Sequence, residues 1–142
     1  MPPVARGSRN DPNRVTEKEY LGQVTDLLTV LGWRHQHLYP LQTAKQGWRT
    51  GCTSPGFPDL LCVRQTYLVA AELKGYSARG DAGRLDPAQA RWLEAFAAIP
   101  TGRAWLLRPT DPPFATLVEW LRNPREAPKV YGWQGASDSL LR

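Results

Sequence analysis

The chain has 142 residues, 42% of them hydrophobic and 22% charged, and a formal net charge of +5. This length suits one domain with its own core and is short for two. No stretch approaches the roughly 18 apolar residues of a membrane span, and the two cysteines do not form a disulfide framework. These features exclude membrane-spanning and disulfide-stapled classes. They predict a soluble, cytoplasmic protein whose positive charge suits a nucleic-acid partner.

Residues 1–15 are predicted to form a basic flexible arm, because they hold Pro, Gly, Ser and arginines without apolar periodicity. A first helix is predicted from about residue 16 to 31, where apolar residues recur at helical spacing. At about 100° per residue, Glu17 falls within the apolar stripe. A carboxylate on a core-facing stripe is unusual, so a specific role for it is expected. Glu19 points away and is explained by a capping box with Thr16.

The next stretch alternates enough to predict a strand over residues 33–39, with His35 and His37 on one face. No third His or Cys lies at ligand spacing, so a groove-facing polar edge is favoured over a zinc site. Residues 40–55 contain no acid and are predicted to be a long basic loop. Three of its side chains suit either contacts with nucleic acid or a solvated loop whose aromatic packs on the core: Lys45, Trp48 and Arg49.

Residues 56–74 contain two short apolar runs around a polar break, the pattern of a buried β-hairpin. A turn centred on Gln65 and Thr66 sets Asp59 opposite Glu72. Directly opposed like charges destabilise a sheet. A shared Mg²⁺ or Mn²⁺ would remove the repulsion, because Mg²⁺ binds carboxylate, water and phosphate oxygens. The alternative is that the charges simply pair at the surface of a hairpin end.

Strand alternation also places Lys74 on the same face as Glu72, with Leu73 on the opposite face. The Gly-rich segment that follows, residues 75–84, is predicted to be a flap that becomes ordered on substrate and carries Arg79 and Arg84. It is not a phosphate-binding P-loop, since no Gly-Lys-Ser/Thr follows.

A second helix is predicted after Asp86, which suits the N-cap and is followed by a proline at the first helical position. Gln89 either closes a capping box with Asp86 or extends the apolar stripe toward the sheet. A strand over residues 103–108 and a short helix over 114–121 complete the domain, which we place at residues 16–122. The remainder, 123–142, is predicted to be a tail. Its apolar residues would be buried by a partner chain or by the domain itself: Tyr131, Trp133, Leu140 and Leu141.

Two short motifs carry a family resemblance. Pro58-Asp59 and Glu72-Leu73-Lys74 resemble the signature of the PD-(D/E)XK nucleases. The wider segments 56–60, 71–74 and 85–93 are similar to the VRR-NUC branch and to related Holliday-junction-resolvase-like proteins. The resemblance covers about residues 16–121. It implies an α/β restriction-endonuclease-like core, ordered α-β-β-β-α-β with an extra C-terminal helix.

The resemblance also implies an activity, a metal-dependent endonuclease that hydrolyses DNA phosphodiester bonds, with junctions or flaps as candidate substrates. Mg²⁺ or Mn²⁺ would bind Asp59, Glu72 and the Leu73 backbone carbonyl. An acid on the first helix, Glu17 in preference to Glu19, would complete the metal site directly or through water. The remaining catalytic residues would be Lys74, which orients water or stabilises transition-state charge, and Gln89, which positions Lys74 or phosphate.

Two alternatives stay open at this stage. A non-catalytic DNA-binding module would share the basic surface but hold no productive metal, and nothing in the residues separates DNA from RNA as the substrate. Resolvase-like relatives work as dimers. The small size and the apolar tail are compatible with a homodimer, although the sequence does not specify an interface.

Overall fold

The computed structural model describes residues 15–38, 40–43, 47–50, 54–75 and 85–134. The predicted arm lies outside the described residues apart from its last position. Most of the predicted flap also lies outside them, as do the basic residues Lys45, Arg79 and Arg84.

The first helix, α1 (Glu17–Val30), begins and ends where the sequence predicts. Its N-cap Thr16 accepts a hydrogen bond from the Glu19 backbone N–H. Gly32 ends it with a φ of 81°, and the N–H of Trp33 reaches back to the Leu28 carbonyl at 2.8 Å. Such a left-handed glycine closes the last helical turn. The buried stripe repeats every four residues, at Tyr20, Val24 and Leu28.

Five strands form one mixed sheet in the order β1-β4-β5-β6-β7. Their bounds are β1 (Arg34–His37), β4 (Leu60–Arg64), β5 (Tyr67–Leu73), β6 (Gly102–Leu107) and β7 (Val130–Tyr131). β1, β4 and β5 are antiparallel neighbours, whereas β5, β6 and β7 run parallel. The predicted hairpin is confirmed, since Arg64 pairs with Tyr67 across a two-residue turn. The helix α2 (Pro87–Ala97) supplies the crossover between β5 and β6.

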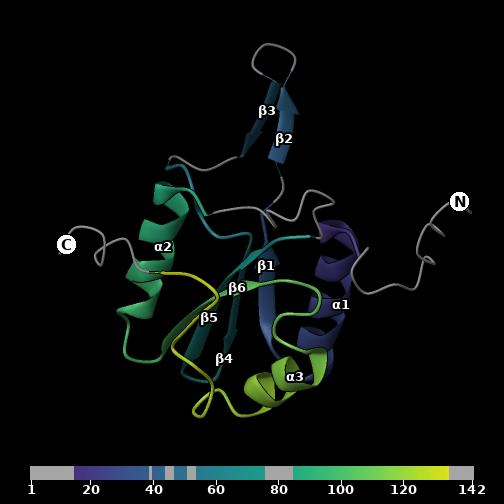
Figure 1. Cartoon of the computed structure of the whole chain (residues 1–142), viewed down its shortest axis with the longest axis vertical. Coiled ribbons are helices and arrows are strands. Elements are labelled where there is room, and N and C mark those ends of the chain that lie inside the picture. Colours follow the sequence, from purple (N-terminus) through teal and green to yellow (C-terminus); the bar gives the residue numbers. More distant parts are fainter. Residues whose placement is uncertain (1–14, 39, 44–46, 51–53, 76–84, 135–142) are drawn as a thin grey trace, which may run out of the picture.

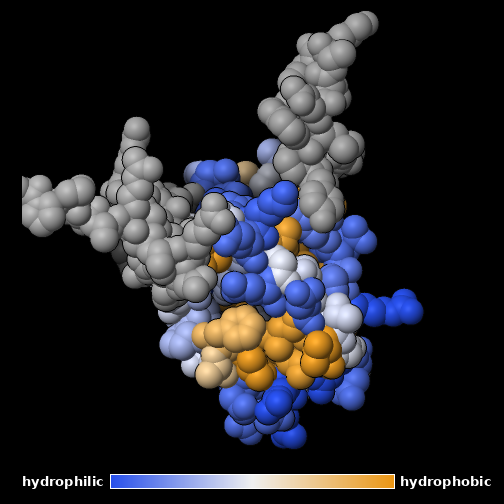
Figure 2. Space-filling view, turned by 90° about the vertical axis from the view of Figure 1, so that its right-hand side faces the viewer, coloured by the Kyte–Doolittle hydropathy of each residue, from blue (hydrophilic) through white to orange (hydrophobic). Residues whose placement is uncertain are grey.

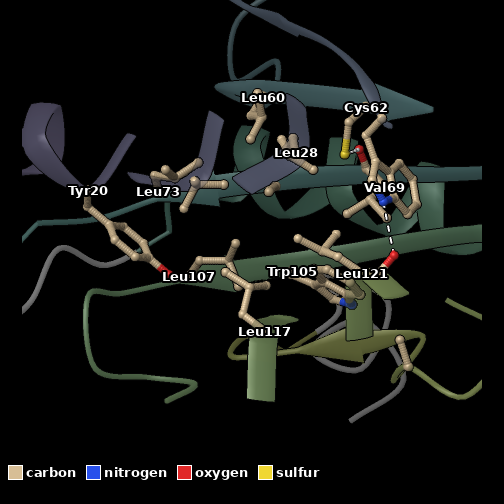
Figure 3. Close-up of a cluster of buried hydrophobic side chains, with 14 residues drawn as sticks. Tyr20, Leu28, Leu60, Cys62, Val69, Leu73, Trp105, Leu107, Leu117 and Leu121 are labelled. Carbon is tan, nitrogen blue, oxygen red and sulfur yellow. Dashed lines mark hydrogen bonds between the residues drawn. The ribbon is translucent and has the colours of Figure 1, made fainter. Parts of the chain in front are cut away.

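The sheet lies between helices on both faces (Figure 1), with α2 on one side and α1 and α3 (Phe114–Arg122) on the other. The larger core fills the α1 and α3 side, around Trp105, Leu28 and Leu121 (Figure 3). A smaller cluster, with Ala70 and Leu93 at its centre, lies under α2. Because β5 is covered on both faces, it is apolar at nearly every position, as expected for a central strand.

The prediction of a loop over residues 40–55 is wrong in part. β2 (Pro40–Thr43) and β3 (Gly47–Thr50) pair with each other as a separate two-stranded sheet, which stands away from the main sheet in Figure 1. The segment has no alternating apolar face to bury in the core. The signal that normally identifies a strand is therefore missing from the sequence.

The segment after residue 122 is not simply a tail, which corrects the predicted domain boundary. β7 extends the sheet beside β6, and the Trp133 indole donates a hydrogen bond to the Ala104 carbonyl at 2.9 Å. The Trp105 indole donates to the Pro128 carbonyl at 2.8 Å. The domain itself thus covers Tyr131 and Trp133, while the last eight residues lie outside the described part.

Figure 2 shows the side of the molecule that carries α1 and α3. Most of this surface is hydrophilic, and apolar side chains gather in one patch. Phe114, at the start of α3, is 41% exposed. In the described ranges no helix has the length and apolar character needed to cross a membrane.

Candidate active site

The predicted acidic pair lies at the end of the sheet where β4 begins and β5 ends. The antiparallel register continues to the pair Leu60 and Ala71, so Asp59 and Glu72 occupy the next positions outward. One oxygen of Asp59, Oδ2, accepts a hydrogen bond from the Leu73 backbone N–H at 3.1 Å. The short turn at the far end of the hairpin sets this register, as the sequence predicted.

Glu72 is the most unusual side chain of the site, because it is a carboxylate with only 3% of its surface exposed. Its Oε1 accepts a hydrogen bond from the Gln89 amide at 3.0 Å and lies 3.8 Å from the Lys74 ammonium nitrogen. Its other oxygen, Oε2, is buried and has no donor among the described residues. A buried carboxylate oxygen without a partner is costly, so this oxygen needs a proton or a cation.

The electrostatics of Glu72 agree with this interpretation. Burial and the nearby Asp59 carboxylate raise its pKa to about 9, and Lys74 only partly opposes the shift. Asp59 and Glu72 can hydrogen-bond to each other only if the pair retains a proton. Near neutral pH, full ionisation of both carboxyls therefore needs an added positive charge.

Gln89 performs both of the functions that the sequence left as alternatives. Its amide oxygen accepts from the Asp86 backbone N–H at 3.0 Å, and Asp86 accepts from the Gln89 N–H at 2.9 Å, which completes the capping box. Its amide nitrogen is left to donate to Glu72. The start of α2 is thus tied directly to the acidic pair.

Gly56 lets the strand that carries Asp59 approach α2 closely. It has a φ of 83°, and a Cβ there would lie 2.6 Å from both the Ala88 carbonyl carbon and the Gln89 nitrogen. The Trp92 indole fixes the same loop by donating to the Pro55 carbonyl at 3.1 Å. Only glycine fits this contact without moving the helix.

Gly56→Ala is therefore expected to destabilise the fold by at least the roughly 1–2 kcal/mol of a left-handed residue, with a clash added. Gly22→Ala is the matched control, because a Cβ there meets no atom within 4 Å. That change, inside α1, should stabilise by about 0.5–1 kcal/mol. Chemical denaturation measures both. Equal effects of the two substitutions would show that the close approach at Gly56 is unimportant.

Glu17 is exposed in the first turn of α1, so it is not part of the buried stripe in which the sequence placed it, but it lies within electrostatic range of Asp59 and Lys74. Partial desolvation raises its pKa, Asp59 raises it further, and Lys74 lowers it. A Cβ on Gly75 would lie 2.5 Å from the Glu17 nitrogen, so the exit of β5 contacts the first turn of α1. Glu19 instead accepts a hydrogen bond from the Thr16 hydroxyl at 3.2 Å, in keeping with the predicted cap. Of these two acids, Glu17 is the one with a charge interaction with Asp59 and Lys74.

His37 is a neighbour of the site that sequence reasoning did not select. It is the last residue of β1 and pairs with Leu60. The backbone N–H of the next residue, Leu38, donates a hydrogen bond to the Asp59 carbonyl at 3.0 Å. Burial lowers the pKa of His37, and the Asp59 carboxylate acts in the opposite direction. Only the pairing of β1 with β4 brings His37 near Asp59, and the residues around position 37 do not predict that pairing.

The donors at this end of the sheet suit a hard cation. Within the described ranges, no three His, Cys, Asp or Glu side chains converge closely enough to enclose a metal. Mg²⁺ does not need such a cage, because it is commonly held by one or two carboxylates with water and substrate phosphate. Asp59 and the partnerless Oε2 of Glu72 are donors of this kind, so the residues fit Mg²⁺ or Mn²⁺.

The stability of the metal-free chain should depend on pH through Glu72. Its folded pKa lies above its ordinary value of 4.5, so the folded state keeps a proton that the unfolded state releases. This contribution is complete below about pH 4.5 and is lost as the pH rises toward 9. In EDTA, the Tm of the wild type should therefore fall more steeply from pH 5 to 8 than the Tm of Glu72→Gln.

Glu119→Gln is the control for this experiment, since Glu119 is exposed and pairs with Arg122 on the surface of α3. It should keep the wild-type dependence on pH. If Glu72→Gln and the wild type gave parallel curves, the buried carboxyl would not carry the proton.

The side chains that the sequence predicts to contact nucleic acid lie outside the described part of the chain. Trp48 and Arg49 belong to β3, but their side chains, like Lys45, Arg79 and Arg84, are outside the described part of the chain. Comparison of the chain with protein-family models, with curated proteins and with solved structures found no match.

Proposed function

We propose that this chain is a metal-dependent nuclease of the PD-(D/E)XK type that hydrolyses phosphodiester bonds in DNA. The observation that carries the proposal is the buried Glu72, which lies beside Asp59 and Lys74 and has one oxygen without a donor in the described chain. The element order supports it. α1, β1, β4, β5, α2 and β6 follow an α-β-β-β-α-β sequence, with β2 and β3 inserted after β1.

The proposed metal site uses Asp59, Glu72 and the Leu73 carbonyl, with Glu17 acting directly or through water. A bound Mg²⁺ or Mn²⁺ would polarise the scissile phosphate and lower the pKa of a bound water. The protein contributes the arrangement of the ligands. Gln89 occupies Oε1 of Glu72, which leaves Oε2 available for a cation.

Lys74 supplies the fixed positive charge of the proposed site. Its ammonium lies 3.8 Å from Glu72, and its backbone N–H donates to the Leu107 carbonyl at 3.0 Å, so the end of the strand holds it in place. Only 20% of its side chain is exposed. A cation held in advance near the phosphate stabilises the extra negative charge of the transition state, or holds the attacking water.

The test is a cleavage assay on a panel of labelled substrates: linear duplex, single strand, flap, four-way junction and RNA. Each is incubated with Mg²⁺, Mn²⁺ or EDTA. We expect cutting that needs the metal and stops in EDTA. The preferred substrate separates a structure-selective enzyme from a general nuclease, and paired symmetric cuts in the junction would indicate a homodimer.

A non-catalytic DNA-binding module is the other outcome of this assay. Binding to DNA without cutting under every metal condition would favour it. The opposed carboxylates would then need an explanation other than catalysis.

A further inference from the structure

A second concave site lies at the end of the sheet opposite the acidic pair. Asp59 comes just before β4 and Arg64 ends it, so about 17 Å of strand separates the two ends. At the far end is an open groove of about 620 Å³, a volume in the usual range of small-molecule sites. Six residues line this turn-end groove: Leu31, Gly32, Arg34, Val63, Arg64 and Gln65.

Arg64 places a fixed positive charge in the wall of the turn-end groove. Its two terminal nitrogens donate to the carbonyls of Leu121 and Arg122 at 2.9 and 3.4 Å. Its guanidinium carbon lies 5.7 Å from the centre of the Trp33 ring. These hydrogen bonds use two of the five N–H donors of the guanidinium group. The group is therefore held in advance and keeps donors for a ligand.

Arg34 adds a second positive charge to the same groove. It is the first residue of β1, it is exposed, and it forms no ion pair with an acid in the described ranges. No acidic side chain is among the residues that line the groove. Guanidinium groups match the oxygens of a phosphate in charge and in geometry. A phosphate in the groove would therefore meet two cations and no competing carboxylate.

The backbone of Gln65 is unusual for its residue type. Its φ is 55°, in the left-handed region, and it lies in the turn between β4 and β5. Gly, Asn or Asp normally occupies such a position. Residues held in this region at an energetic cost gather at ligand sites. The amide of Gln65, which lines the groove, is a polar group suited to a ligand there.

The turn-end groove also has an apolar wall. Val63 is 39% exposed, whereas Leu60 and Cys62 on the same strand are buried. Leu31 lines the groove as well. A bare phosphate ion would leave these side chains unused, but a sugar or a base attached to the phosphate would cover them.

We infer that the turn-end groove binds a nucleotide unit, with its phosphate on Arg34 and Arg64 and its sugar or base against Val63. The ligand is one unit of a nucleic-acid strand or a free nucleotide, because both present the same phosphate and ring. The groove shares no residue with the proposed metal site. The inference therefore goes beyond the proposed function and does not depend on it.

The test is an NMR titration of the full chain in EDTA, followed at the backbone amides of Gly32, Val63 and Gln65. The probes are thymidine 5′-monophosphate, inorganic phosphate, thymidine and a short oligothymidylate. We expect saturable shifts with the monophosphate, weaker binding of phosphate and no binding of thymidine. Tighter binding of the oligothymidylate at the same amides identifies a strand as the ligand, and tighter binding of the monophosphate identifies a free nucleotide.

Three variants show whether the named side chains hold the ligand. Arg34→Met should weaken binding of the monophosphate about tenfold or more, the cost of losing a hydrogen bond between charged groups. Gln65→Gly should weaken it about 2- to 10-fold and raise the Tm, because glycine accepts the positive φ. Arg91→Met should bind as the wild type does, since Arg91 is exposed on α2 and does not line the groove.

The inference is overturned if no phosphate-bearing probe gives saturable shifts at these amides, or if Arg34→Met and the wild type bind equally well. Equal affinities for thymidine and its monophosphate would also overturn it, since the phosphate would then contribute nothing. None of these results affects the proposed nuclease, whose activity is measured separately with a metal.

Discussion

Asp59→Asn is expected to abolish metal-dependent cleavage. The asparagine keeps the shape of the side chain and can still accept the hydrogen bond from the Leu73 N–H. It lacks the negative charge that a divalent cation requires. The loss should reach about 10³-fold or more, beyond the roughly 10- to 100-fold typical of losing an outer partner. Single-turnover cleavage in Mn²⁺ measures it.

The same substitution should not harm the fold. It removes the charge that, after burial, does most to raise the pKa of Glu72, so thermal stability in EDTA should be equal to or above that of the wild type. Asp26→Asn, an exposed change on α1, is the control and should retain full activity. Wild-type cutting by Asp59→Asn would exclude Asp59 as a required ligand.

Lys74→Met is expected to lower kcat by about 10²–10³-fold, the usual cost of removing one preorganised group that stabilises a transition state. The methionine keeps the apolar stem and removes the ammonium. Because Lys74 also lowers the pKa of Glu72, its loss should further weaken metal binding near neutral pH. Lys74→Arg should retain part of the activity.

Arg122→Met controls for the loss of a positive charge. Arg122 is exposed in the last turn of α3 and pairs only with Glu119 among the described residues. This variant should cut at the wild-type rate. A similar loss in Arg122→Met and Lys74→Met would mean that the overall charge matters and the placement of Lys74 does not.

The centre of the site could be predicted because its geometry is local. A two-residue turn and a period of two are sufficient to set Asp59 opposite Glu72 and to place Lys74 beside it. The capping signals of α2 were equally local. The sequence left the function of Gln89 open because its bond to Glu72 joins two elements that are distant along the chain.

The features that the sequence missed depend on pairings between distant segments. β7 contains only Val130 and Tyr131, and these residues form a strand because they pair with the edge of β6. β2 and β3 pair only with each other, with no apolar face to indicate the register. The end of β1 lies beside Asp59 through the pairing of β1 with β4, for which the local pattern around residue 37 contains no signal.

The most direct test of the acidic pair as a metal site is anomalous diffraction from crystals of the chain grown with Mn²⁺ and a short DNA duplex. We expect a manganese peak between Asp59 and Glu72, bound by Oε2 of Glu72 and close to the DNA backbone. A peak elsewhere, with Asp59 and Glu72 hydrogen-bonded to each other beside bound DNA, would contradict it.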